Sequence, residues 1–354
     1  MNWDVLRIII TCVAGGILSG VLGLVLLPVL RALKAGQSVH KIGPTWHNSK
    51  VGTPLMGGLM FIGSVIVCLL INLFTVQNYT VYFSLGFSLC FALIGFLDDF
   101  CKVKFKRELG LTAFQKMALQ MAVSAIYLFI LFKYNQKSPN ESLPFQLLPI
   151  HGDITSGLYI PFFNKVLSLE FVPEVIRFPL YFIFAMFVMV GTVNAVNLTD
   201  GIDGLCATVT LPVMAFFAVV ACMMGMWDLA LLPACLFGGL IAYLFYNWHP
   251  AKVFMGDTGS LFLGGVVCAL AFALNMPVIL ILVGFVYMVE VLSDLIQFAY
   301  FRATGGKRFF KMAPIHHHFE KCGWKEVKIV LVFSAVSTLM CLLAYWGVSG
   351  IFAK

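Results

Sequence analysis

The acidic residues are the first ones in this chain from which chemistry can be inferred, because there are only 16 of them in 354 residues. Five stand at the ends of apolar runs: Asp98, Asp99, Asp200, Asp203 and Asp257. A carboxylate beside an apolar helix is costly unless it is paired or liganded. A single aspartate at a helix end is often no more than a cap or a surface ion pair. Five on one face, with cationic loops around them, predict a site that binds a metal ion and an anion.

The adjacent pair Asp98 and Asp99 cannot address one point equally, since neighbouring helical residues point about 100° apart. One carboxylate can face a reacting phosphate while the other holds a metal or a lysine. Lys102 follows one turn later, on the side of Asp98. This motif alone is weak, because an exposed ion pair would look the same.

The segment 194–204 (NAVNLTDGIDG) is more specific, since it places amides, carboxylates and glycines directly after an apolar run. Amide and carboxylate groups suit the recognition of a base or a ribose, and glycine lets the backbone approach a ligand. We therefore expect Asn197, Asp200 and Asp203 to contact substrate.

A second turn, 254–260 (FMGDTGS), opens the next apolar run. Mg²⁺ takes carboxylate oxygens together with phosphate oxygens, which makes Asp257 a candidate metal ligand. The backbone N–H groups at this helix start could also meet an anion, although an ordinary helix cap is the alternative.

Three consecutive histidines, His316, His317 and His318, lie in the segment 312–324 (MAPIHHHFEKCGW). Three successive side chains cannot all face one ion on a helix, so zinc is not indicated. With basic residues around the tract, phosphate or pyrophosphate binding is favoured. Lys50, beside His47 and ahead of the second apolar run, adds another cation.

The elements that position these residues follow from composition. The chain is 61% hydrophobic and 11% charged, with a mean hydropathy of +0.96. Soluble domains carry about 25% charged residues. A soluble enzyme, a disordered chain and a disulfide-rich secreted scaffold are therefore excluded. The ten cysteines show no CxxC pair, and the net charge of +7 is scattered, so no nucleic-acid partner is indicated.

A membrane-spanning helix needs about 20 apolar residues, and the chain has room for about ten. We predict an all-α polytopic membrane protein, with residues 1–354 forming one integral-membrane domain. The predicted spans are 5–30, 53–75, 80–98, 114–133, 174–196, 205–226, 229–247, 260–276, 277–301 and 327–350.

Orientation follows from the basic residues, most of which fall in loops on one face. This face is expected to be cytoplasmic, with both termini outside. The outer segment 135–173 is expected to form a hairpin on the membrane, and the His-rich loop spans about 302–326. Within the ninth predicted span, Glu290 and Asp294 share a face with Gln297 nearby. This face either lines a cleft or makes interhelical hydrogen bonds.

Taken together, these motifs resemble the polyprenyl-phosphate N-acetylhexosamine-1-phosphate transferase superfamily, from about residue 47 to 324. Segment 312–320 with Gly323 and Trp324 is similar to the branch that transfers phospho-N-acetylmuramoyl-pentapeptide, and differs from the branch that uses N-acetylglucosamine. The resemblance implies a ten-span fold with a cleft on the cytoplasmic face of a bacterial inner membrane. It also implies a Mg²⁺-dependent reaction in which UDP-MurNAc-pentapeptide and undecaprenyl phosphate give lipid I and UMP.

The resemblance also implies roles for individual residues. It places catalytic groups at Asp98, Asp99, Asp257 and His316, with Asp257 as the metal ligand. It places substrate-binding groups at Lys50, Lys102, Lys116, Asn197, Asp200, Asp203, Asn247, Phe254, Gln297, His317 and His318. Phe254 is a candidate to stack on uracil.

The residues leave the order of bond making open. The lipid phosphate could attack directly, or Asp98 could attack first and form a covalent intermediate. We expect direct attack, because a phosphate monoester with a second pKa of about 6 is already largely ionised at pH 7. A transporter and a non-catalytic scaffold are the competing functions, and neither requires five aspartates at one membrane boundary. The bilayer is the third expected partner, and the family resemblance is compatible with a homodimer.

Overall fold

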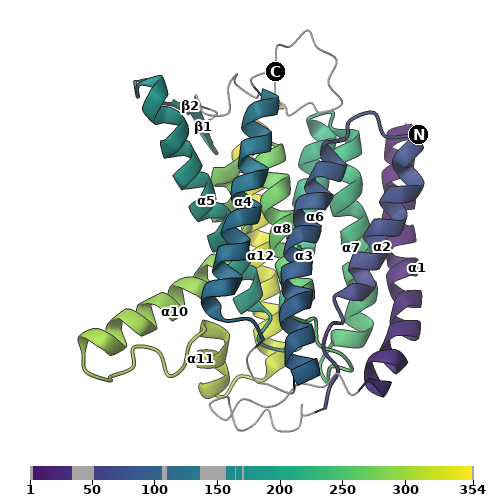
Figure 1. Cartoon of the computed structure of the whole chain (residues 1–354), viewed down its shortest axis with the longest axis vertical. Helices are drawn as coiled ribbons and strands as arrows, with labels where there is room; N and C mark the ends of the chain where they lie inside the picture. Colours follow the sequence, from purple (N-terminus) through teal and green to yellow (C-terminus); the bar gives the residue numbers. More distant parts are fainter. Residues whose placement is uncertain are drawn as a thin grey trace.

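The structure is a computed structural model that describes residues 3–33, 52–105, 110–135, 157–163, 165–169 and 171–352. It is mostly helical, as predicted (Figure 1). The helices are α1 (Trp3–Ala32), α2 (Leu59–Ile71), η2 (Asn72–Phe74), α3 (Thr80–Phe105), α4 (Ala113–Asn135), α5 (Glu174–Thr199), α6 (Leu205–Met223), α7 (Trp227–Asn247), α8 (Gly256–Ala273), η3 (Pro277–Ile279), α9 (Leu280–Val283), α10 (Phe285–Ala303), α11 (Ile315–Lys321) and α12 (Glu326–Ser349).

Within the described ranges, eight helices are long and apolar enough to cross a membrane, and a bent pair raises this number to nine. The chain is therefore a polytopic membrane protein. The segment predicted as the second span forms only the shorter apolar helix Leu59–Phe74. α1 begins and α12 ends at the same end of the bundle, opposite α11 (Figure 1).

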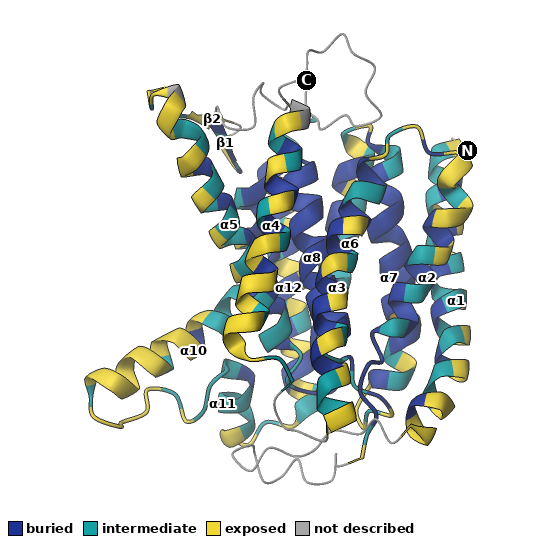
Figure 2. Ribbon diagram, in the orientation of Figure 1, coloured by how far each residue is buried: buried dark blue, intermediate teal, exposed yellow. Residues whose placement is uncertain are grey.

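The prediction of one continuous ninth span over 277–301 is wrong. Helices η3 and α9 end at Val283, and α10 leaves at an angle of 83°. Gly284 stands at the break, and a Cβ there would lie 2.6 Å from the carbonyl oxygen of Leu280. Beyond the break α10 runs outward from the bundle, and its outer part is exposed (Figure 2).

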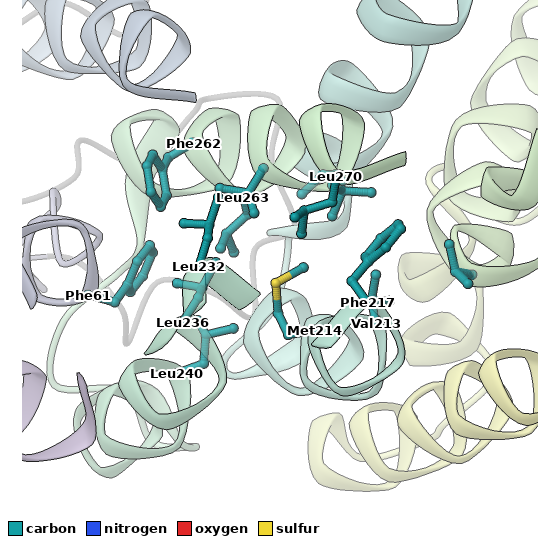
Figure 3. Close-up of a cluster of buried hydrophobic side chains, with 14 of the residues drawn as sticks. Phe61, Val213, Met214, Phe217, Leu232, Leu236, Leu240, Phe262, Leu263 and Leu270 are labelled. Carbon is teal, nitrogen blue, oxygen red and sulfur yellow. The ribbon is translucent and has the colours of Figure 1, made fainter. Parts of the chain in front are cut away.

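Helix α8 forms the centre of the bundle and is buried over most of its surface. It packs against α3 and α5, while α1 packs on α7 at the edge of the molecule. Figure 3 shows the apolar contact between α8 and its neighbours, with Phe262 and Leu263 facing Phe61 of α2 and Leu232 of α7. Because α3 packs along α8, the end of α3 lies beside the beginning of α8.

Within the segment 135–173, which was expected to form a hairpin on the membrane, the described residues contain one pair of strands. Strands β1 (Gly157–Ile160) and β2 (Lys165–Ser168) pair antiparallel, with Gly157 opposite Ser168 and Ile160 opposite Lys165. The N–H of Phe162 donates to the carbonyl of Gly347 at 2.7 Å, which ties the hairpin to α12. His151 to Asp153 lie outside the described residues.

Candidate active site

Three of the five aspartates meet where α3 ends and α8 begins. Carboxylate oxygens of Asp98, Asp99 and Asp257 lie within 4.8 Å of one another. Asp98 and Asp99 are almost completely buried, at 3% and 1% exposure. The sequence predicted that five aspartates converge, and the structure brings these three together while Asp203 belongs to a separate group.

Two lysines face the Asp257 carboxylate. Its Oδ2 lies 3.0 Å from Nζ of Lys102 and 2.7 Å from Nζ of Lys116. Its Oδ1 accepts a hydrogen bond of 2.8 Å from the amide of Asn197, which also donates to the hydroxyl of Ser260. Residues from three helices, α3, α4 and α5, therefore converge on one carboxylate of α8.

Asp98 also contacts Lys102, one of these two lysines. Its Oδ2 lies 2.6 Å from Nζ of Lys102, and its Oδ1 accepts the N–H of Leu111 at 2.7 Å. The contact between Asp98 and Lys102 agrees with the prediction from their spacing, which places them one helical turn apart. An anion that reached this centre would meet two ammonium groups held by carboxylates.

Asp99 points to the beginning of α8. Its oxygens accept the N–H of Asp257 at 3.2 Å, the N–H of Thr258 at 2.9 Å and the hydroxyl of Thr258 at 2.7 Å. The first N–H groups of a helix have no partner within the helix, so a carboxylate there satisfies them and complements the helix dipole. These contacts favour a positioning role for Asp99.

Two glycines allow this close approach. A Cβ at Gly95 would lie 2.1 Å from the carbonyl oxygen of Asp257, so α3 could not rest on α8 with any larger residue. Gly256 has a positive φ of 74°, and a Cβ there would lie 2.5 Å from Oδ2 of Asp99. Both positions require glycine for the aspartates to meet.

The segment 194–204 divides between two places. Asn197 reaches Asp257, and the half-buried Asp200 follows it at the end of α5. Burial raises the pKa of Asp200 well above its usual value, and the negative charges of Asp257, Asp99 and Asp203 raise it further. Asp200 therefore keeps its proton to higher pH than an ordinary aspartate.

Asp203 turns away from the lysine centre. Its Oδ2 lies 3.0 Å from Nδ1 of His249 and accepts the N–H of Ala251 at 3.0 Å. Nearby, Asn247 accepts the N–H of Gly204 and donates to the carbonyl of Val253. These bonds brace the turn after α7.

The histidine tract lies in α11. His316 is buried, and its Nδ1 lies 3.0 Å from Oε2 of Glu290. Its Nε2 faces Gly201, where a Cβ would be only 2.1 Å away. His317 pairs with Glu320 at 2.5 Å.

Of the remaining candidates, His318 accepts the N–H of Lys311 at 3.1 Å through Nδ1. Gln297 accepts the N–H groups of Phe309 and Phe310, which holds the loop after α10. Phe254 is half-buried at the turn before α8. Lys50 and His47 lie outside the described residues.

Several contacts were not predicted. The contacts of Thr258 and Ser260 are among them, although hydroxyl residues one and three positions after an aspartate at a helix start are a usable signal. The sequence places Glu290 on a polar face of an apolar run. Its partner His316 is 26 residues away, and no local spacing connects them.

The three clustered carboxylates fit a divalent cation. Mg²⁺ prefers oxygen ligands and is commonly held by one or two carboxylates together with substrate phosphates. The two ammonium groups beside Asp257 show that this position attracts positive charge. In the described part of the chain a second group, Asp203, His249 and Glu326, also has ligand atoms within 4.8 Å of one another.

Comparison with known proteins agrees with this geometry. Residues 80–275, which include α3 to α8, match the family described as glycosyl transferase family 4, so fold and site define a membrane-bound transferase of this family. The phospho-N-acetylmuramoyl-pentapeptide-transferase of Clostridium perfringens (strain 13 / Type A) is 41% identical over 96% of this chain and 98% of its own. Those of Clostridium botulinum (strain Alaska E43 / Type E3) and Carboxydothermus hydrogenoformans are 43% and 44% identical, over 92% of this chain and 92% and 94% of theirs. The chain belongs to the phospho-N-acetylmuramoyl-pentapeptide-transferase family.

Proposed function

We propose that this protein transfers phospho-MurNAc-pentapeptide from UDP-MurNAc-pentapeptide to undecaprenyl phosphate, giving lipid I and UMP for peptidoglycan synthesis. The observation that carries this proposal is the junction of α3 and α8, where three carboxylates and two lysines meet within the segment matched by the family. The relatives named above cover nearly the whole chain, which supports the same donor and acceptor.

The chemistry requires positioning and charge neutralisation more than covalent help from the protein. A phosphate oxygen of the lipid bonds to the β-phosphorus of the donor, and the bond from that phosphorus to the bridging oxygen breaks. UMP leaves with the electron pair. Lys102 and Lys116 place two positive charges beside the developing negative charge, and Asp98 orients the attacking phosphate.

Mg²⁺ is the cofactor that fits this donor set, with Asp257 as its ligand. When bound, it neutralises charge on the donor diphosphate. Asp99 holds the start of α8 and thereby fixes the direction of Asp257. Asn197 orients the same carboxylate from α5.

Substrate-binding groups surround this centre. We assign the nucleotide to the side of Asp200, Asp203, Asn247 and Phe254, and the sugar diphosphate to the side of the histidine tract. His316 is the catalytic candidate there, because Glu290 holds its ring and its Nε2 faces Gly201. Lys50, Gln297, His317 and His318 complete the proposed set.

The arrangement in the membrane completes the proposal. The site lies on the cytoplasmic face, both termini lie outside, and residues 1–354 form one domain in the inner membrane of a bacterium. A homodimer is compatible with this arrangement.

The test uses purified protein in detergent with undecaprenyl phosphate, Mg²⁺ and either UDP-MurNAc-pentapeptide or UDP-N-acetylglucosamine. We expect lipid-dependent release of UMP with the first donor alone, and its loss on chelation with EDTA. Release of UDP would indicate glycosyl transfer and contradict the proposal. Turnover with UDP-N-acetylglucosamine alone would assign the chain to the sister reaction.

A further inference from the structure

An open cavity of ≈ 960 Å³ lies beside the histidine tract, between α11, the start of α12 and the turn after α7. Its volume is at the upper end of the range of about 300–1,000 Å³ typical of ligand sites. Its lining includes His249 and Trp324 together with three lysines and two glutamates: Lys311, Lys321, Lys325, Glu320 and Glu326. The cavity therefore combines an aromatic wall with many charges.

The charges of this cavity do not balance. Glu320 already pairs with His317, and Glu326 lies 3.5 Å from Nδ1 of His249. Lys311 and Lys325, in contrast, form no ion pair with a carboxylate in the ranges that the structure describes. Among the described residues, the ammonium group of Lys311 donates only to the carbonyl of Lys321, at 3.4 Å. The cavity thus offers cationic groups to an anionic ligand.

Two contacts connect the lining of the cavity with residues of the proposed active site. Glu320 on its wall binds His317, whose neighbour His316 covers Gly201. His249 on the opposite wall binds Asp203, two residues after Gly201. The cavity therefore adjoins the residues to which we assign the sugar diphosphate.

We propose that this cavity is a subsite for the stem peptide of the donor, with Lys311 and Lys325 binding peptide carboxylates. The inference rests on the proposed function, because it takes the donor to carry a pentapeptide. A peptide joined to the sugar through its amino end finishes in a free carboxylate, and ammonium groups bind carboxylates through charge-assisted hydrogen bonds. Trp324 provides an apolar surface for small side chains of the same peptide.

The test compares two donors that differ only in the peptide. Binding of UDP-MurNAc-pentapeptide and of UDP-MurNAc is measured by titration calorimetry on the full-length protein in detergent with Mg²⁺. The variant is the double substitution Lys311→Gln and Lys325→Gln. Both lysines are exposed, so the fold tolerates their replacement. Lys307→Gln is the matched control, an exposed lysine of the same loop that does not line the cavity.

We expect the double variant to weaken binding of UDP-MurNAc-pentapeptide about tenfold or more, and to leave UDP-MurNAc and the control unchanged. Equal weakening of both donors would overturn the subsite, since the lysines would then bind the diphosphate. Unchanged binding of both donors would overturn it as well. Failure of the proposed function is separate, because it would appear as absence of UMP release by the unsubstituted chain.

Discussion

Glu290 of α10 and His316 of α11 form a buried pair, with 3.0 Å between Oε2 and Nδ1. Neither residue is exposed by more than 1%. Each side chain has a second polar atom that lies outside this contact. Among the residues that the structure describes, neither Oε1 of Glu290 nor Nε2 of His316 has a hydrogen-bond partner. The ring is thus oriented from one side, and its second nitrogen is left to face Gly201.

We expect Glu290→Gln to lower the turnover number for lipid I formation about tenfold. A hydrogen bond to a charged group contributes about 1.5–3 kcal/mol, and the neutral amide of glutamine accepts a weaker bond that holds the His316 ring less firmly. The control is Asp294→Asn, one turn further along α10, where the carboxylate is exposed. Equal turnover by the Glu290→Gln variant and the unsubstituted chain would remove Glu290 from the account.

Replacement of Asp257 tests the centre of the proposed site. We expect Asp257→Asn to reduce UMP release at least about a hundredfold, because the metal ligand and the partner of two lysines are lost together. The Asp294→Asn variant again serves as the control, and thermal unfolding in detergent checks that both chains are folded. UMP release within a few-fold of the unsubstituted chain would contradict the role of Asp257.

Asp99 has a structural contribution that can be measured apart from turnover. We expect Asp99→Ala to lower the free energy of unfolding by about 1–3 kcal/mol, because N–H groups at the start of α8 lose their acceptor. Thr258→Val removes only the hydroxyl donor and should cost less, about 1 kcal/mol. Denaturation midpoints in detergent compare the two. A larger effect of Thr258→Val would contradict the assignment of Asp99 as the cap of α8.

Asp228 in the first turn of α7 pairs with Arg7 of α1 through its Oδ1. Its Oδ2 accepts the N–H groups of Gln77 and Asn78 at 3.0 and 2.9 Å. The pair is nearly buried, at 10% and 12% side-chain exposure. We expect Asp228→Ala to destabilise the fold by about 3–5 kcal/mol, because Arg7 keeps a charge without its partner.

We expect the Asp228→Ala variant to unfold at a lower temperature and to release UMP at the normal rate per folded molecule at low temperature. The double variant Arg7→Met and Asp228→Leu should recover part of the lost stability, since no charge is left behind. A fall in turnover by the folded Asp228→Ala variant would show that the end of α7 that carries Asp228 affects the site.

The positions of most site residues could be predicted because they stand at the ends of apolar runs. Hydropathy fixes where a helix leaves the membrane, and basic loops fix which ends share a face. Asp98, Asp99 and Asp257 were placed together by this reasoning alone. The same reasoning did not reveal that Asp99 binds backbone N–H groups, since both roles require a carboxylate at the same position.

Features set by irregular backbone could not be predicted. The break at Gly284 is invisible to an average over apolar residues, because the residues on both sides remain apolar. Asp203 turns toward His249 since the chain passes through Gly201 and Gly204, the latter at a φ of 77°. His316 becomes the partner of Glu290 because the loop after α10 folds back and places His316 beside Glu290.

The transfer of a phosphosugar is the central claim, and the fate of the β-phosphorus tests it most directly. The donor is UDP-MurNAc-pentapeptide labelled with ³²P at the β-phosphate, incubated with the protein, undecaprenyl phosphate and Mg²⁺. The account predicts that the label appears in the lipid product while unlabelled UMP is released, and that Asp257→Asn shows neither. Label retained in released UDP would contradict the account, because the sugar would then have moved without its phosphate.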